Sequence, residues 1–165
     1  MRRKKRDRRI GRRRTNGAAI DFSSLDLFAG HLTRVVQVRL FQLYYGRLAH
    51  LRVSPGGFAV LMAIHSNPGI QHGPLAHAIA ARGPNLTKLV DGLVRAGWVE
   101  RRAITGDKRA TGHFLTASGR AKAEAALKTG LAHDERATAG LSAGERKTLL
   151  RLLAKLDRAL ASRPR

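Results

Sequence analysis

Basic and hydrogen-bonding side chains are concentrated in two short stretches near the middle of the chain. Arginine and lysine attract phosphates, while amide and hydroxyl groups bond either phosphates or the edges of bases. The residues of interest are Arg82, Pro84, Asn85, Thr87 and Lys88 in the first stretch, and Arg101, Asp107, Lys108 and Arg109 in the second. These residue types in these clusters favour contact with a nucleic acid over bond-making chemistry.

The apolar residues around the first stretch predict two helices joined by a tight turn. Their helical spacing runs through Leu75, Ala76, Ile79 and Ala80, and then through Leu86, Leu89, Val90, Leu93 and Val94. The second helix should begin near Pro84, since proline is tolerated in a first turn, and end at Gly97. Two such helices, the second with a polar first turn, predict a helix-turn-helix.

A basic hairpin is predicted directly after these helices. Residues 98–101 and 112–115 have the character of short strands, and Thr105-Gly106-Asp107 supplies turn chemistry between them. The hairpin carries four basic residues, Arg101, Arg102, Lys108 and Arg109. Such a hairpin is typical of the wing of a winged helix and suits a narrow, negative minor groove.

This central stretch closely resembles the MarR family of bacterial transcriptional regulators. The resemblance is carried by Leu75-Ala76, Leu89-Val90-Asp91, Leu93, Gly97-Trp98-Val99-Glu100-Arg101, Asp107-Lys108-Arg109, and Leu115-Thr116 with Gly119. It implies that Asp107 holds Arg109 in position and that Arg109 enters the minor groove beside the major-groove helix. The chain departs from the family at Ala80, where glycine is common, and at Arg82-Gly83-Pro84, which replaces a Ser-rich helix start.

Helices are expected on both sides of this centre. The first should begin at a capping box, Ser23 with Asp26, and run to about Leu51. That length is roughly 26 residues, or about 39 Å at 1.5 Å per residue, so part of its apolar stripe should bury against another chain. Ser54-Pro55 should open the next helix, which Asn67-Pro68-Gly69 should end before a minimal strand at Ile70.

Two further helices should follow the hairpin. Thr116 is predicted to cap the first, which runs to about Thr138 with a weak point at Gly130. A capping box, Ser142 with Glu145, should open the second. Its apolar stripe is Leu149, Leu152, Leu153, Leu156 and Leu160.

The predicted fold class is mainly α with a small β-wing. A winged helix-turn-helix lobe at residues 53–116 should lie between dimerisation helices at 20–52 and 117–162, after a disordered basic arm at 1–19. In the resembled family the first and the last two helices interlock with those of a second copy, in agreement with the terminal apolar stripes. A twofold dimer presents two recognition helices about one DNA turn apart, which predicts a pseudo-palindromic site.

Composition narrows the class of partner. The net charge is +21 and the pI is about 11.9, which favours a polyanion. The first fourteen residues hold ten Arg or Lys and one Asp, so +9 lies there and +12 remains elsewhere. The arm either lies along DNA or is a dispensable tail. The absence of cysteine excludes thiol redox sensing, disulfides and Cys-ligated metals.

Other functional classes find little support in the sequence. The seven histidines lack tight ligand spacing, with His72 and His77 the nearest pair, so no metal is expected. Nucleotide-binding and hydrolase motifs do not occur, so we expect no enzyme. Neither a long apolar run nor a secretory signal is present, which predicts a cytoplasmic protein without a membrane span.

The resemblance also implies a small-molecule effector, such as an aromatic carboxylate or an acyl thioester, bound between the dimer helices and the winged lobe. Candidate residues on the first helix are His31, Arg34, Arg39, Tyr44 and Tyr45. The alternative is that these side chains merely border a dimer seam. No other cofactor is expected.

Two functional hypotheses follow. The first is a homodimeric, sequence-specific transcription factor of the MarR type that represses until a ligand relieves it. The second is a sequence-tolerant architectural, nucleoid-associated protein dominated by its basic arm. The two hypotheses predict different binding preferences. A repressor binds its operator typically ~10³-fold or more tightly than random duplex, whereas an architectural protein binds both alike.

Overall fold

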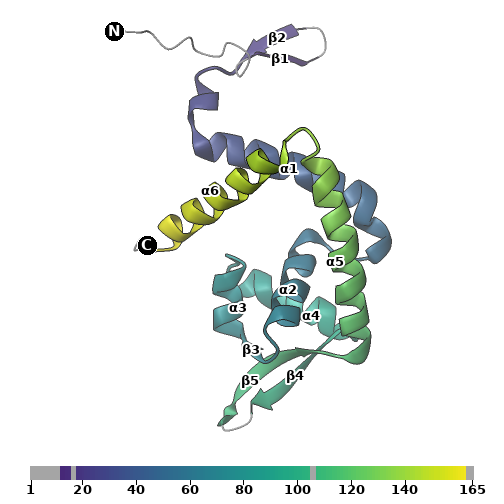
Figure 1. Cartoon of the computed structure of the whole chain (residues 1–165). Helices are drawn as coiled ribbons and strands as arrows, with labels where there is room; N and C mark the ends of the chain where they lie inside the picture. Colours follow the sequence, from purple (N-terminus) through teal and green to yellow (C-terminus); the bar gives the residue numbers. More distant parts are fainter. Residues whose placement is uncertain (1–11, 16–17, 105–106, 163–165) are drawn as a thin grey trace. The chain divides into compact units, whose positions relative to one another are not determined.

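The computed structural model describes residues 12–15, 18–104 and 107–162, with the backbone alone at 12–15, 18–20, 46–49 and 107–109. The chain divides into two compact units, Met1–Leu43 and Tyr44–Arg165. Its elements are shown in Figure 1 and are mainly helical, with small antiparallel sheets. The predicted fold class is confirmed.

The first unit begins with a pair of short strands. β1 (Arg12–Thr15) pairs antiparallel with β2 (Ala18–Asp21), so that Arg12 lies opposite Asp21. These residues fall within or beside the arm that was expected to lack regular structure, and the structure differs from that expectation there. Residues 1–11 and 16–17 of the arm lie outside the described residues.

The first long helix starts later than the sequence predicted. The backbone N–H of Ser23 donates to the Asp21 carboxylate at 2.8 Å, and a 3₁₀ turn, η1 (Leu25–Leu27), follows. Only after this turn does α1 (Ala29–Leu48) begin, and a second 3₁₀ turn, η2 (Ala49–Leu51), follows it. The predicted capping box at Ser23 is therefore wrong, because a side chain upstream of it already bonds its backbone N–H.

The second unit contains the winged lobe. Its helices are α2 (Pro55–Ser66), α3 (His72–Ala78) and α4 (Gly83–Arg95), and its three-stranded sheet is ordered β3-β5-β4. The strands are β3 (Ile70–Gln71), β4 (Val99–Ile104) and β5 (Asp107–Leu115). The predicted helix-turn-helix and wing are confirmed, and both wing strands are longer than predicted.

The core of the lobe is built around α2, which packs against α3, α4, α5 and β5 (Figure 1). Six side chains are completely buried there, namely Val60, Leu61, Ile64, Leu75, Leu86 and Val90. Burying each contributes about 1.5–3 kcal/mol of hydrophobic free energy. Val99 and Leu115 join the same cluster from the wing strands, so the wing and α4 are held by one core.

Local capping signals set the helix starts in this unit. The hydroxyl of Ser54 accepts from the backbone N–H of Gly57 at 3.1 Å, at the start of α2. Thr116 caps α5 (Ala117–Ala137) by accepting from Gly119 N–H at 2.9 Å. Ser142 and Glu145 form the predicted capping box at α6 (Ala143–Ala161), and those hydrogen bonds lower the pKa of the Glu145 carboxyl.

Gly119 and Gly130 both lie at closely packed positions. A Cβ atom at Gly119 would collide with the carbonyl oxygen of Trp98, and one at Gly130 would lie 3.0 Å from the ring of Phe58. The α5 helix runs without interruption through Gly130. Gly130 leaves room there for an aromatic ring of α2, and its cost to the stability of the helix stays a prediction.

Several long apolar side chains are left at the surface of this chain. On α6 they are Leu149, Leu150, Leu152, Leu153, Leu156 and Leu160, whose exposed fractions run from 39% to 55%. Among the described residues, no helix is both long and apolar enough to cross a membrane. One side of α6 therefore exposes an apolar row of leucines.

The turn between α3 and α4 contains a residue in an unfavourable conformation. Ala80 has φ of 51°, in the left-handed region that costs a residue with a Cβ atom about 1–2 kcal/mol. Its side chain is exposed, so packing does not compensate. The sequence departure at Ala80 thus falls where the backbone favours glycine.

We expect Ala80→Gly to raise the free energy of unfolding by about 0.5–1 kcal/mol, because glycine adopts this φ without steric conflict. Equilibrium denaturation measures the change. The matched control is Ala78→Gly, at the end of α3 but in helical conformation, which should lower stability by about 0.5–1 kcal/mol. Destabilisation by both substitutions would contradict strain at Ala80.

Candidate nucleic-acid interface

The start of α4 presents a polar surface because its opposite side is buried. Leu86, Val90 and Leu93 face the core, whereas Arg82, Pro84, Asn85, Thr87 and Lys88 are all accessible to solvent. Arg82 is the N-cap in extended conformation and its side chain makes no capping hydrogen bond. The five predicted residues lie together at the accessible start of α4 and its entry.

Thr87 has a more restricted role than its exposure suggests. Its hydroxyl donates to the carbonyl oxygen of Gly83 at 3.0 Å, and the same hydroxyl oxygen lies 3.5 Å from Nε2 of His72. Because its hydrogen is used within the helix, Thr87 presents an acceptor oxygen and a methyl group. That combination suits a base amino group or a thymine methyl.

Arg101 has a partner within the chain. Its guanidinium contacts the carboxylate of Asp91 at 2.5 Å, joining β4 to the last part of α4. Both side chains are more than one third exposed, so the pair contributes only about 0–1 kcal/mol to stability. Its geometry ties the wing to the recognition helix, and a DNA contact by Arg101 would compete with it.

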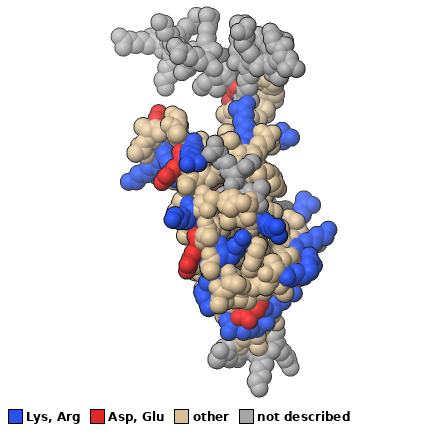
Figure 2. Space-filling model, turned by 90° about the vertical axis from the view of Figure 1, so that its right-hand side faces the viewer, with Lys and Arg blue, Asp and Glu red and all other residues tan. Residues whose placement is uncertain are grey.

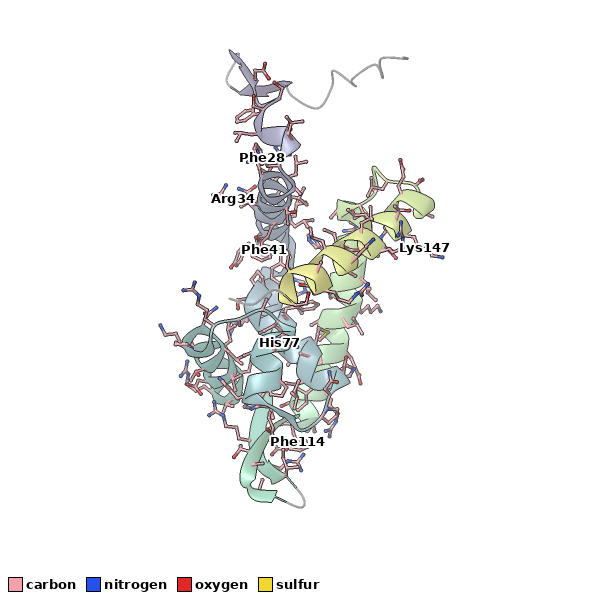
Figure 3. The ribbon with its side chains drawn as sticks, turned by 90° about the vertical axis from the view of Figure 1, so that its left-hand side faces the viewer. Phe28, Arg34, Phe41, His77, Phe114 and Lys147 are labelled. Atoms are coloured by element: carbon pink, nitrogen blue, oxygen red, sulfur yellow. The ribbon has the colours of Figure 1, made fainter. Side chains whose placement is uncertain are left out.

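Arg102 lies along the wing sheet. Its guanidinium carbon stands 4.0 Å from the centroid of the Phe114 ring, and its Nε is 3.3 Å from a Glu100 oxygen. The aromatic face and the carboxylate both hold the arginine against the strands. Phe114, labelled in Figure 3, therefore supports a basic side chain at the wing surface.

The wing tip is described only in its backbone. Asp107 opens β5 opposite Ile104, next to an irregularity between Ala103 and Ile104. The side chains of Asp107, Lys108 and Arg109 lie outside the described part of the structure, as do residues 105–106. That Asp107 positions Arg109 for the minor groove stays a prediction.

The candidate effector residues are divided between the two units. In the first unit, His31 stacks on Phe22 and lies 3.8 Å from an Asp26 oxygen, and Arg34 and Arg39 are exposed. Figure 3 shows Arg34 and Phe41 projecting from the same side of α1. These residues are available at a surface, but they do not by themselves form a closed site.

In the second unit, Tyr44 is buried and its hydroxyl is already hydrogen-bonded. Its hydroxyl donates to the carbonyl oxygen of Val53 at 3.1 Å, and its ring meets Phe58 and His133 edge-on. Burial and the neighbouring Tyr45 raise the pKa of Tyr44. Tyr44 is thus a packing residue in this conformation, whereas Tyr45 is 59% exposed.

The structure brings together two histidines that the sequence did not pair. The ring of His72 lies 5.9 Å from that of His113, measured between centroids, whereas His77 is exposed on α3. Strand alternation was the available signal, because His113 is two residues before buried Leu115 and so shares its inward face. Among the described residues, no group of three or more metal-ligating side chains occurs.

The electrostatic character of the surface matches a polyanionic partner. Figure 2 shows Lys and Arg side chains distributed over the visible face, with few acidic ones among them. Of the chain's acidic residues, Asp91, Glu100 and Asp134 are paired with arginines. Exposed positive charge therefore remains in excess.

Comparison with known proteins identifies the family. A model described as the MarR family matches residues 53–111. The transcriptional regulator HosA of Escherichia coli is 30% identical over 120 residues, which cover 72% of this chain and 89% of HosA. The chain belongs to the MarR family. It is thus a DNA-binding transcriptional regulator and not an enzyme.

Two solved MarR-type structures contain DNA. The transcriptional repressor CouR bound to a 23-mer duplex has a TM-score of 0.77 and 27% identity, covering 84% of this chain and 99% of CouR. A mutant MarR from E. coli complexed with operator DNA has a TM-score of 0.69 and 31% identity, covering 77% of this chain and 91% of that one. The winged-helix architecture of this MarR-family chain is that of proteins solved with DNA.

We expect Arg101→Gln to change operator affinity less than about threefold, because Arg101 is engaged with Asp91. Binding titrations at matched salt measure this effect. A double-mutant cycle with Asp91→Asn should give a coupling energy of about 0.2–1 kcal/mol in unfolding experiments. A tenfold loss of affinity in Arg101→Gln, with unchanged stability, would instead assign Arg101 to DNA.

Proposed function

We propose that this MarR-family regulator is a homodimeric repressor that binds a pseudo-palindromic operator until a small ligand relieves it. The observation that carries the proposal is the exposed polar first turn of α4, held beside the wing by a single core. A helix presented in this way fits the major groove, and a wing beside it reaches the adjacent minor groove.

Operator recognition would then have two parts. Arg82, Asn85, Thr87 and Lys88 supply charge, an amide and an acceptor oxygen at the major groove. Arg109, with Asp107 and Lys108, supplies charge at the wing tip. Base contacts by the helix determine sequence preference, while the wing adds affinity in a narrow, negative groove.

The homodimer is supported by the apolar side chains that this chain leaves exposed. Six leucines of α6 are at least 39% exposed, and in unit 1 Phe28, Val36 and Phe41 are exposed on or beside α1. Apolar surface of this extent favours burial against a partner. A second copy offers the same surface, which a twofold interface requires.

The effector is proposed as an aromatic carboxylate or an acyl thioester. Arg34 and Arg39 offer charge to an anion, and exposed Tyr45 offers an aromatic face. Such a ligand relieves repression when it binds more tightly to the dimer spacing that does not fit DNA. Calorimetry with a panel of aromatic acids and acyl thioesters tests this part, and no heat across the panel would contradict it.

The alternative, an architectural protein, is favoured by one observation, the +9 charge of the first fourteen residues. Binding to the gene's own upstream DNA and to random duplex, over a salt series, separates the two. The same series is run on a variant lacking residues 1–11, which removes seven of the ten basic residues and keeps the sequences of β1 and β2. A preference for the upstream DNA that survives the deletion supports the repressor, and equal binding that collapses with the deletion supports the alternative.

We expect Arg109→Ala to weaken operator binding at least tenfold, or about 1.4 kcal/mol, because it removes the minor-groove cation. Fluorescence anisotropy at fixed ionic strength measures the loss. Lys147→Ala, which removes a positive charge from exposed α6, is the matched control and should have less than about a twofold effect. Equal losses in the two variants would exclude a specific role for Arg109.

We expect Leu153→Asp to convert the dimer to monomer, because it places a charge within the apolar face of α6. Sedimentation at micromolar concentrations measures the oligomeric state. Arg151→Asp, on the polar side of the same helix, should leave the dimer intact. A wild-type monomer at these concentrations would overturn the homodimer itself.

A further inference from the structure

A histidine is buried inside the wing sheet without a hydrogen-bond partner. His113 is the central residue of a three-strand row, with Ile70 of β3 opposite it on one side and Arg101 of β4 on the other. Its side chain is 3% exposed, and neither ring nitrogen has a hydrogen-bond partner in the described part of the chain. Burying an imidazole in this way is tolerable only while it is neutral.

His113 contacts a second histidine that reaches the recognition helix. The ring of His72, at the start of α3, lies 5.9 Å from that of His113 at an interplanar angle of 60°. Nε2 of His72 lies 3.5 Å from the Thr87 hydroxyl oxygen on α4. A continuous row of side chains therefore runs from β5, through α3, to the exposed turn predicted to contact DNA.

The groups around His113 disfavour its protonation. Burial lowers the pKa of His113, and Arg101 and His72 lower it further. The acidic groups described in this region, Asp91 and Glu100, are paired with Arg101 and Arg102. Neither carboxylate is thus free to compensate an imidazolium at His113.

The other elements packed against β5 bring no buried carboxylate to His113: on α5, Glu124 and Glu135 are exposed and Asp134 is paired with Arg146. On β3, Ile70 and Gln71 carry no titratable group, and on α2 the only one is His65. On α5, Arg120 donates to the carbonyl oxygen of Leu115. Protonated His113 would therefore gain no buried carboxylate from any of these elements.

We propose that His113 and His72 form a proton-sensitive link between the wing and the recognition helix, through which acidification weakens operator binding. Protonation of His113 places an unpaired charge in the sheet, beside Arg101 and His72. The charge is relieved when the His113 ring leaves its site, which displaces β5 and removes the His72 contact from Thr87. This inference rests on the proposed operator binding.

The lowered pKa of His113 determines whether acid strengthens or weakens the folded state, and in which pH range. A histidine whose folded pKa lies below its unfolded value of about 6.5 stabilises the folded state fully only above that value. The stability is lost as the pH falls below about 6.5 and through the folded pKa. The ordinary effect of protonating surface histidines is opposite, because added positive charge strengthens DNA binding.

Operator binding by the full-length protein is measured at pH 7.5 and pH 5.5, at constant ionic strength. We compare wild type with His113→Val, which places an apolar, strand-forming side chain in the buried site. His77→Gln is the matched control, since it removes an exposed histidine from α3. On acidification, wild type and His77→Gln should each lose about tenfold more affinity than His113→Val. Parallel pH profiles in all three proteins would overturn the proposal.

A second measurement keeps this test separate from the proposed function. The imidazole ¹H resonances of His113 and the amide resonances of β5 and Thr87 are followed by NMR against pH, without DNA. We expect them to move together below pH 6.5 and the Thr87 change to disappear in His113→Val and in His72→Gln. Coupled shifts in a protein that shows no operator preference at pH 7.5 would reject operator binding but retain the link. Changes of the His113 and Thr87 resonances at different pH midpoints would reject the link. If His113→Val fails to fold, a change of the Thr87 amide resonance that persists in His72→Gln would also reject it.

Discussion

The burial of one side of α4 against α2 is the constraint on which the interface depends. Leu86 and Val90 are completely buried in the same cluster as Val60, Leu61 and Ile64. A helix buried along one face must present its opposite face to solvent, so the position of the apolar residues determines which polar residues are displayed. The exposed polar face of α4 is thus a consequence of core packing, and a change in the core would reorient that face.

The wing is held by that same core at its base. Val99 and Leu115 lie opposite each other in the sheet and belong to the cluster, while Trp98 and Gly119 approach closely at the β4–α5 junction. Farther out, the Arg101–Asp91 pair joins β4 to α4. Helix and wing therefore share one apolar base. Along β4 the side chains become less buried from Val99 to Ala103.

Two features of this chain lower its folding stability near the proposed DNA-binding surface. Ala80 holds the turn before α4 in a conformation that glycine would adopt at lower cost, and His113 occupies an interior strand position without a hydrogen-bond partner among the described residues. Destabilised groups beside a binding surface are typical of sites whose conformation responds to conditions. Ala80 precedes the exposed turn of α4, and His113 lies in the sheet beside it, so both unfavourable groups adjoin the proposed DNA-binding surface.

The sequence alone determined the helix-turn-helix, the wing and most helix boundaries, because these depend on local chemistry. Ser54, Thr116 and Ser142 cap helices with side chains that bond backbone groups three residues away, and apolar spacing marked the buried faces. Tertiary structure alone decided that Asp91 engages Arg101, that Gly130 admits Phe58 and that His113 meets His72. The late start of α1 was also missed, because Asp21 competes for the backbone of Ser23. Partners distant in sequence leave no periodic signal, since their meeting depends on how complete elements pack.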